Sequence, residues 1–380
     1  MGRHYLDHAS TSPARPEVVE AMLAWLATTA DPGRVHTEGR LARVAVEDAR
    51  ERVAALLGAR PREVVFTSGA TEAIATAVWG ATSAPTASAS GGRAHVVCPA
   101  VEHSAVRESS AAWAIVTTVG ADAVGRVAPA EVVAAIRPGQ TTLVHLQWAN
   151  HEVGTVQPVA EVAAACHDLG VAVHTDAAAA AGHLPVSLAG AGVDLLSVSA
   201  HKLGGPPGVG ALLVRRGLRL PPLLRGGDQE RARRAGAENV AGIVGFGAAA
   251  EVLCGRLAPE AADARRRTDR VLGLTAAVDG VRVYGDPVAR APHLVCLGVD
   301  GVEAEAVVLG LDQAGVAVHS GSACSSESLE PSPVLEAMGV DARHSVRVSV
   351  GWGSTDADVD ALVTALPAVV GRLRALAGGA

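Results

Sequence analysis

The stretch from about residue 60 to residue 216 alternates short runs rich in strand-forming residues with longer runs of helical periodicity. This alternation is typical of a mainly parallel β-sheet covered by helices, because parallel strands need long crossover connections. Six strands are predicted on this basis, at residues 63–66, 95–98, 142–147, 171–175, 195–199 and 210–214. Residues 41–57 and 161–169 have the amphipathic pattern of helices. The sequence therefore predicts an α/β fold.

A second region begins near Pro259, where the run at residues 262–267 is expected to open a long helix. Short strands at 281–284 and 293–297 then alternate with helices, which predicts a smaller α+β domain. Because 380 residues exceed what one core usually serves, we expect two domains. The large domain would span 16–258, and the small one would combine 1–15 with 259–380. The low-complexity segment 81–92 is expected to be an exposed loop.

Composition limits the possible partners and the compartment. The net charge is −7 and no basic stripe interleaved with aromatic residues is present, so nucleic acid is not expected as a direct ligand. The sequence shows neither a signal peptide nor an apolar run of membrane-spanning length, which predicts a cytoplasmic protein without membrane attachment. Five widely spaced cysteines suggest neither a disulfide framework nor a metal site. All except Cys324 lie in apolar surroundings and are expected to be buried.

Lys202 is the only lysine in the sequence, since the other members of the 32 Lys+Arg residues are all arginine. An arginine guanidinium stays protonated, whereas a desolvated lysine amine can lose its proton and attack a carbonyl to form an imine. The alternative is that a lysine-poor chain kept one surface lysine by chance. The residues around Lys202 have to decide between these interpretations.

The run Thr67-Ser-Gly-Ala70-Thr71-Glu72 ends one predicted strand and opens a helix. Its free backbone N–H groups and the Thr71 hydroxyl would form an anion site suited to a phosphate group. Considered alone, however, the segment favours an ordinary helix cap with Ser68 or Thr71 as the capping residue.

Asp176 follows the predicted strand at 171–175 and precedes a run of small alanines, which suits contact with a flat ring. Its alternative role is the N-cap of the next helix. A phosphate anchor, a carboxylate and an imine-forming lysine together predict a site for pyridoxal 5'-phosphate. Ser199 and His201 are placed to reach the phosphate. His103 could lie on the ring and transfer protons, although a lone histidine at a strand end is more often structural.

At this point the sequence resembles the cysteine desulfurase family of class V, fold-type I pyridoxal-phosphate enzymes. The resemblance covers essentially the whole chain. Its segments are Leu6-Asp-His-Ala-Ser-Thr-Ser-Pro13, Phe66-Thr-Ser-Gly-Ala-Thr-Glu72, Val101-Glu-His103, Asn150-His-Glu-Val-Gly154, His174-Thr-Asp176, Ser199-Ala-His-Lys202 and Ser320-Gly-Ser-Ala-Cys-Ser-Ser326. The resemblance implies a large domain with a seven-stranded sheet, a small domain that carries the catalytic cysteine, and a homodimer.

The resemblance also assigns roles to residues. Cys324 would accept the sulfur, and Arg347 and Asn150 would bind the substrate. Lys202 and His103 would be catalytic. The cofactor would be held by Ala70, Thr71, His103, His151, Asp176, Ser199, His201 and Lys202. In the implied reaction Lys202 acts as a base on the α-carbon of L-cysteine, Cys324 attacks the sulfur, and alanine and a Cys324 persulfide result. A sulfur-acceptor protein would then take the sulfur.

Four positions depart from the family pattern. His151 replaces an asparagine and Ala179 a glutamine, and both usual residues contact the same ring oxygen; we hypothesise that His151 replaces both donors. Ala237 stands where a threonine reaches the partner subunit's phosphate. Asp31 replaces an asparagine near the substrate carboxylate, where its charge needs compensation by Arg34 or another group. These changes keep open a selenocysteine lyase or another C–S lyase, and a non-catalytic adaptor is a further alternative.

Overall fold

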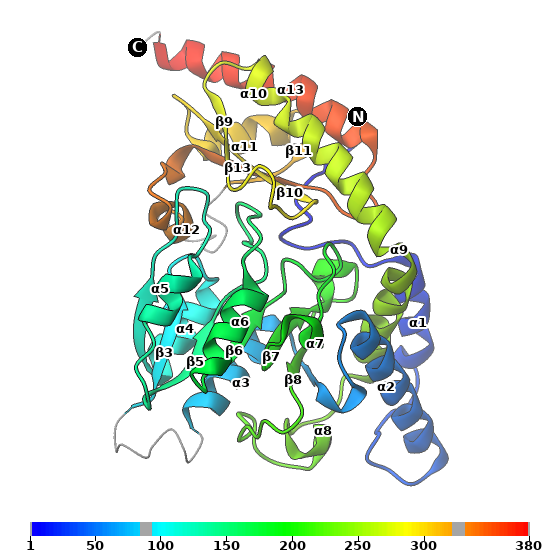
Figure 1. Cartoon of the computed structure of the whole chain (residues 1–380). Coiled ribbons are helices and arrows are strands. Elements are labelled where there is room, and N and C mark those ends of the chain that lie inside the picture. Colours follow the sequence, from blue (N-terminus) through cyan, green and yellow to red (C-terminus); the bar gives the residue numbers. More distant parts are fainter. Residues whose placement is uncertain (1, 84–92, 321–330, 379–380) are drawn as a thin grey trace.

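The computed structural model describes residues 2–83, 93–320 and 331–378. Most of the predicted loop at 81–92 and the predicted sulfur acceptor Cys324 therefore lie outside the described residues. The chain forms two parts, which Figure 1 shows as a lower body around a large sheet and an upper body around a small one.

The large sheet has seven strands in the order β2-β8-β7-β6-β5-β3-β4. Their bounds are β2 Val64–Thr67, β3 His95–Pro99, β4 Ile115–Val119, β5 Thr141–His145, β6 Ala172–Asp176, β7 Leu195–Ser199 and β8 Gly210–Val214. Strands β4, β3, β5, β6 and β7 pair in parallel, whereas β8 runs antiparallel to both β7 and β2. This confirms the mainly parallel sheet. The sequence missed β4, a mostly solvent-accessible edge strand without a continuous apolar run.

Helices cover both faces of this sheet because neighbouring strand residues point to opposite sides. Val65, Leu212 and Val214 pack with α3 (Ala70–Thr82) and, nearby, α4 (Ser104–Trp113) in one core cluster. Val64, Phe66 and Leu213 belong to the cluster on the other face. The helices that contribute to that second cluster are α1 (Pro16–Leu26), α2 (Thr37–Leu56), α5 (Pro129–Ala134), α6 (Val159–Asp168), α7 (Leu188–Ala191), α9 (Val240–Leu272) and α12 (Pro333–Ala337).

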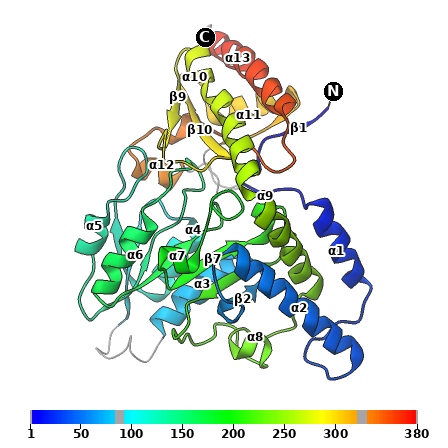
Figure 2. The same ribbon diagram turned by 45° about the vertical axis from the view of Figure 1, so that its right-hand side comes forward.

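The second part has its own small sheet and core. The sheet is antiparallel in the order β12-β13-β10-β9, and a separate parallel pair joins β1 to β11. The strands are β1 His4–Tyr5, β9 Val281–Tyr284, β10 Leu294–Val299, β11 Val316–Ala317, β12 His319–Ser320 and β13 Ser345–Ser349. The helices are α10 Leu274–Ala277, α11 Ala304–Gln313, α12 Pro333–Ala337 and α13 Asp356–Gly378. Figures 1 and 2 show both termini in this upper body, as the pairing of β1 requires.

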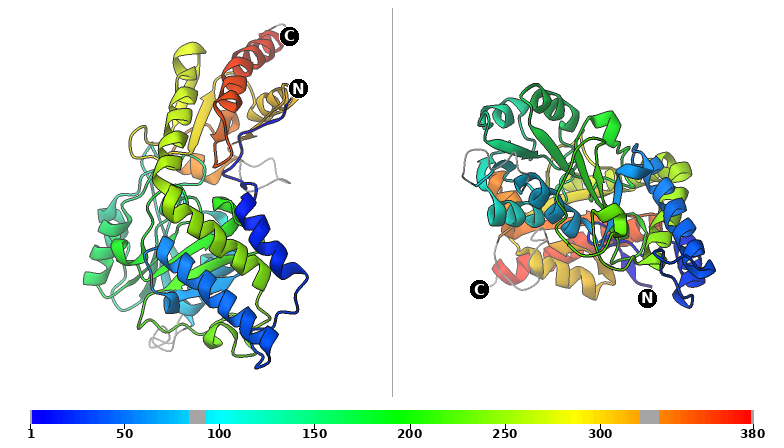
Figure 3. Two further views of the ribbon diagram at one scale, coloured as in Figure 1. Left: turned by 90° about the vertical axis from the view of Figure 1, so that its right-hand side faces the viewer. Right: turned by 90° about the horizontal axis from the view of Figure 1, so that it is seen from below.

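The predicted helix start near residue 262 is wrong, because α9 runs without a break from Val240 to Leu272. Pro259 lies inside this helix on an exposed turn, where the backbone carbonyl that it leaves unpaired can face water. Figure 3 shows α9 extending from the lower body into the upper one. The predicted domain boundary at 258/259 therefore falls within a shared helix, and the division into two domains stays a prediction.

The segment Val240–Ala277 is also long and apolar enough to cross a membrane by length and composition. However, 56% of its most apolar window is buried inside the protein, as in the core helix of a soluble protein. Figures 2 and 3 show its first half packed beside α1 and α2.

Strand β2 is an edge of the large sheet, and a strained turn covers it. In α8 (Gln229–Ala232) the residues Glu230, Arg231 and Ala232 have φ values of 48°, 58° and 58°, a region that costs non-glycine residues energy. Glu230 is buried and receives two hydrogen bonds from Arg50, at 2.7 and 2.8 Å, and one from the Phe66 N–H at 2.9 Å. The Arg50–Glu230 pair fixes the turn. Glu230 also gives a hydrogen-bond acceptor to the Phe66 N–H on the otherwise unpaired edge of β2.

Candidate active site

A cavity of about 550 Å³ lies at the carboxyl ends of the central strands. Among the predicted site residues, it is lined by Ala70, Thr71, His103, His151, Asp176, Ser199, His201, Lys202 and Arg347. Side chains from β6, β7, the turns after β3 and β5, and β13 thus meet in one place although they are far apart in sequence. This is the edge at which open α/β sheets bind ligands.

The start of α3 is open toward this cavity. Its N-cap residue is Gly69, and no side chain in the described ranges caps the helix. Ser68, one of the predicted caps, instead gives its N–H to Glu72 at 2.8 Å, and Glu72 also pairs with Arg234 at 2.9 Å. The favoured cap interpretation is therefore wrong. The uncapped amides leave a position that attracts an anion.

Ser199 and His201 border the same end of the cavity, with 3.3 Å between Ser199 Oγ and His201 Nδ1. Burial, and then the charge of Lys202, lowers the pKa of His201 to about 4. His201 is therefore neutral near neutral pH and acts through hydrogen bonds, not through charge.

Lys202 lies on a short 3-10 turn, Ala200–Leu203, directly after β7. Its Nζ donates to the backbone oxygen of Ala9, which lies in the segment between β1 and α1. Two stacked histidines, His183 and His293, lie nearby with ring centroids 3.5 Å apart. Burial lowers the pKa of His183 to about 3 and that of His293 well below its usual value. Both rings are neutral, so they add no positive charge beside the lysine.

Asp176 ends β6 and is 9% exposed. Its Oδ1 accepts a hydrogen bond from the Ala178 N–H at 2.9 Å, and its backbone oxygen accepts one from the Trp148 N–H at 2.8 Å. The local turn thus fixes the carboxylate at the cavity wall. Ala178 and Ala179 line the cavity beside it and leave space for a flat group.

His103 caps α4, because its Nδ1 accepts a hydrogen bond from the Ala105 N–H at 3.1 Å. An accepting Nδ1 carries no hydrogen, so in the neutral ring the hydrogen is on Nε2. The ring lies edge-to-face with His151, with centroids 4.9 Å apart. His103 therefore has both a structural role and a position on the cavity wall.

His151 has a buried Nδ1 with no hydrogen-bond partner among the described residues. Its Nε2 lies 3.5 Å from Glu152 Oε1. The residue lines the cavity, but this nitrogen is buried away from it. The hypothesis that His151 donates to a bound ring therefore stays a prediction.

Arg347, from β13, is 2% exposed and lines the cavity. It donates to Asp7 Oδ1 at 3.0 Å, to Ser10 Oγ at 2.7 Å and to the His151 backbone oxygen at 3.1 Å. Its Nε makes no hydrogen bond within the described ranges. A guanidinium anchored in this way can still offer a donor to a substrate carboxylate.

Asn150 does not line the cavity. Its side chain donates to the Val101 backbone oxygen at 3.1 Å and accepts from the Glu152 and Val153 N–H groups at 2.8 and 2.9 Å. These bonds fix the turn after β5, so the geometry gives Asn150 a structural role and does not support its predicted contact with the substrate.

Sequence reasoning missed two neighbouring residues, Gln147 after β5 and Glu102 after β3. Gln147 lines the cavity, and its side chain donates to the Val101 backbone oxygen at 2.6 Å. Glu102, beside His103, is 1% exposed and accepts from the Gln147 N–H at 2.5 Å. Its Oε2 has no partner in the described part of the chain. No local sequence pattern marks this contact, because Glu102 and Gln147 are 45 positions apart.

Glu102 gives a testable pH dependence. Burial, and then the charge of Asp176, raises its pKa to about 8. Between its ordinary pKa and about 8 the folded protein holds a proton that the unfolded chain releases, so stability falls as pH rises through this window. The slope is at most about 1.4 kcal/mol per pH unit. We expect Glu102→Gln to remove this slope in urea unfolding.

The matched control for this experiment is Glu108→Gln, which changes an exposed glutamate on α4. It should follow the wild-type pH dependence. Equal slopes for wild type and Glu102→Gln would show that Glu102 is ionised in the folded protein.

Comparisons with known proteins agree with this geometry. The family model for class-V aminotransferases matches residues 4–362. A cysteine desulfurase of Cereibacter sphaeroides is 41% identical, covering 99% of this chain and 98% of its own. An IscS-like cysteine desulfurase of Mycobacterium tuberculosis is also 41% identical, with 97% of both chains covered. The chain belongs to the cysteine desulfurase family.

Solved structures of this family confirm the fold-type I architecture. A NifS-like protein superposes with a TM-score of 0.89 at 30% identity, covering 98% of this chain and 100% of its own. The protein SspA, solved in complex with cysteine, has a TM-score of 0.81 at 29% identity, with 93% and 100% covered. Members of the family generally depend on pyridoxal phosphate.

Two departures from the family pattern can be located. The side chain of Asp31 is about half exposed, does not line the cavity, and pairs with Arg34 at 2.8 Å, so the compensation considered for its charge is present. Ala237 is exposed and lines a small separate pocket near Arg234. The predicted loss of a phosphate contact at Ala237 stays a prediction.

Three of the four cysteines other than Cys324 are buried, as the sequence analysis expected. Cys98, Cys166 and Cys296 are buried, and burial raises the pKa of all three thiols, to about 11 for Cys166. The burial predicted for Cys254 is wrong. It lies on the solvent-facing side of α9, between buried Leu253 and exposed Gly255.

Proposed function

We propose that the chain is a pyridoxal 5'-phosphate-dependent cysteine desulfurase, which moves the sulfur of L-cysteine to Cys324 and releases L-alanine. One observation carries this proposal. A single cavity gathers an uncapped helix start, a buried carboxylate at Asp176 and the only lysine of the sequence. Anion site, ring-level acid and amine are the groups that this cofactor needs.

The residues present fit the cofactor. The open N-terminus of α3, with Ser199 and His201, would hold the phosphate. Asp176 would hold the protonated ring nitrogen, and His151, which also lines the cavity, would donate to the ring oxygen. When bound, the cofactor supplies an electron-accepting ring that stabilises negative charge on the substrate α-carbon.

Residues of the chain supply binding and proton transfer. Arg347, anchored by Asp7 and Ser10, would bind the substrate carboxylate and orient the α-carbon. Lys202, the only lysine of the sequence, lines the cavity and would take the α-proton. His103 would move protons at its Nε2, since Nδ1 is committed to the helix cap.

Cys324 would then attack the substrate sulfur as a thiolate and keep it as a persulfide. A sulfur-acceptor protein would remove it. The chain would act in the cytoplasm.

We also propose a homodimer. Val19, Leu23 and Leu26 lie at spacings of four and three on α1 and are 46%, 62% and 66% exposed. Leu41 and Val44 are similarly exposed on α2. Figure 3 shows α1 and α2 on one side of the lower body. A second copy that covers this apolar surface would explain why it is not polar.

The test is a turnover assay that measures alanine, sulfide and pyruvate from L-cysteine and L-selenocysteine. With an excess of a thiol reductant, which releases the persulfide sulfur as sulfide, we expect alanine and sulfide in equal amounts from L-cysteine, with loss of both in Cys324→Ser. Pyruvate as the main product would instead indicate an eliminating C–S lyase. Turnover of L-selenocysteine alone, independent of Cys324, would indicate a selenocysteine lyase. Absence of turnover with either would favour an adaptor.

His151 provides a prediction about cofactor affinity. Loss of its donor in His151→Ala should weaken cofactor binding by about fivefold, which corresponds to about 1 kcal/mol for one hydrogen bond. Fluorescence titration of the apoprotein with the cofactor measures this affinity. Adding Ala179→Gln to the variant places an amide donor on the same wall and should recover part of it. An unchanged affinity in His151→Ala would show that His151 does not contact the cofactor.

A further inference from the structure

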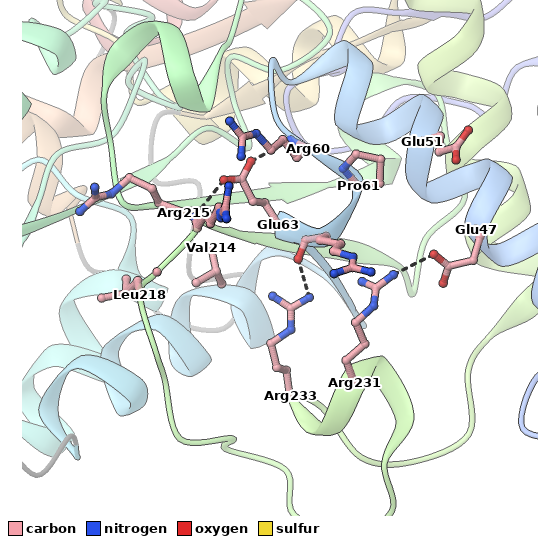
Figure 4. Close-up of a pocket in the computed structure, with 13 residues that line it drawn as sticks. Glu47, Glu51, Arg60, Pro61, Glu63, Val214, Arg215, Leu218, Arg231 and Arg233 are labelled. Carbon is pink, nitrogen blue, oxygen red and sulfur yellow. Dashed lines mark hydrogen bonds and ion pairs between the residues drawn. The ribbon is translucent and has the colours of Figure 1, made fainter.

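A second cavity, of about 950 Å³, lies away from the candidate active site and shares no lining residue with it. It is formed where the 3-10 turn Pro61–Glu63, the segment after β8 and the strained turn α8 meet beside α2. Figure 4 shows arginine side chains entering this space from several sides. Its charged lining residues are Glu47, Glu51, Arg60, Arg62, Glu63, Arg215, Arg216, Arg231 and Arg233.

This lining is strongly basic on an acidic protein. Six arginines against three glutamates give a formal charge of +3, whereas the whole chain carries −7. Arg231 pairs with Glu47 at 2.8 Å and Arg215 with Asp194 at 2.6 Å. The guanidiniums of Arg60, Arg62, Arg216 and Arg233 form no ion pair with the described residues.

Glu51 and Glu63, the other two lining glutamates, form no ion pair with these arginines in the described part of the chain. Glu63 accepts hydrogen bonds from two backbone groups, the Arg60 N–H at 2.8 Å and the Arg216 N–H at 2.9 Å. Its carboxylate therefore fastens two walls of the cavity together, as Figure 4 shows. The side chains of Arg60 and Arg216 are left to the cavity.

Arg233 shows that the concentration of positive charge is unfavourable in this structure. It is half-buried and donates to the backbone oxygens of Arg62 at 2.8 Å and Val64 at 3.4 Å. Burial, and then the charge of Arg231, lowers the pKa of its guanidinium. Arg231 lies in the turn with three consecutive positive φ values, and Arg233 follows that turn. Arg233 is thus a half-buried cation close to a second arginine, and a bound anion would offset this unfavourable environment.

We propose that this cavity binds a chain of phosphate groups, as in a nucleoside triphosphate or an RNA backbone. An arginine guanidinium can donate two hydrogen bonds to one phosphate group. Arg62, Arg216 and Arg233 come from three different segments around the cavity, so they could contact successive phosphates. The volume lies in the range of small-molecule sites.

The experiment uses the full, cofactor-saturated protein, so that the phosphate position in the active site is filled. Isothermal titration calorimetry with tripolyphosphate at fixed ionic strength measures binding. We expect the double variant Arg62→Gln with Arg216→Gln to raise the dissociation constant by at least about tenfold. Each lost charge-assisted contact costs about that factor in affinity. Arg372→Gln, which removes an exposed arginine on α13, is the matched control and should bind as wild type does.

Further arms identify the source of the phosphates. Competition by ATP but not by a short single-stranded RNA assigns the site to a free nucleotide, and the reverse assigns it to RNA. Unchanged alanine production in the double variant shows that it is folded. Equal binding by all three proteins, absence of binding, or variant-dependent binding of poly-glutamate without binding of tripolyphosphate would overturn the proposal.

Discussion

Lys202→Arg is expected to lower alanine production from L-cysteine by roughly 10²- to 10⁴-fold or more, the usual contribution of a positioned base. The substitution keeps the positive charge beside the Ala9 carbonyl but removes an amine that can lose its proton and attack a carbonyl. The visible absorbance of the bound cofactor should change with the activity. Steady-state alanine assays and absorbance spectra measure the two effects.

The control for Lys202→Arg is the converse exchange at a surface site, Arg372→Lys on α13. It should leave both alanine production and the spectrum unchanged. Turnover within about threefold of wild type in Lys202→Arg would contradict the assignment of Lys202 as base.

Glu230→Gln is expected to destabilise the protein by about 3–5 kcal/mol, the usual cost of breaking a buried ion pair from one side. The substitution leaves Arg50 buried without its carboxylate, since the two side chains are each 3% exposed. It also releases the strained turn at residues 230–232 and weakens the cover over β2. Urea unfolding measures the free energy, and a cofactor titration shows whether the site is retained.

An exposed ion pair supplies the comparison for Glu230. Arg52 and Glu251 lie 2.9 Å apart with side chains 43% and 61% exposed. Glu251→Gln should change stability by less than about 1 kcal/mol, because water screens such pairs. If the two variants lost similar amounts of stability, the turn would not depend on the buried pair.

The central part of the fold and most of the site could be predicted because they depend on local patterns. Strands buried on both faces form continuous apolar runs, and the polar residues that follow them, such as Asp176 and Lys202, converge by topology alone. The position of Arg347 rested on the family resemblance instead, and the structure places it in the same cavity.

Other features depend on tertiary contacts that the sequence does not display. Edge strand β4 is mostly solvent-accessible and lacks the apolar run of the central strands. Helix α9 continues through Pro259 because that turn faces solvent, where an unpaired carbonyl costs little. Asn150 matched a family motif, yet three internal hydrogen bonds occupy its amide. The contact between Glu102 and Gln147 joins residues 45 positions apart.

The most direct test of the account is mass spectrometry of the protein after one turnover with L-cysteine and without an acceptor. The account predicts one added sulfur atom on the peptide that contains Cys324, with one alanine released per chain. Cys254→Ser, which removes the exposed cysteine of α9, should not change this result. Added sulfur on Cys254 in place of Cys324, or alanine without any protein-bound sulfur, would contradict it.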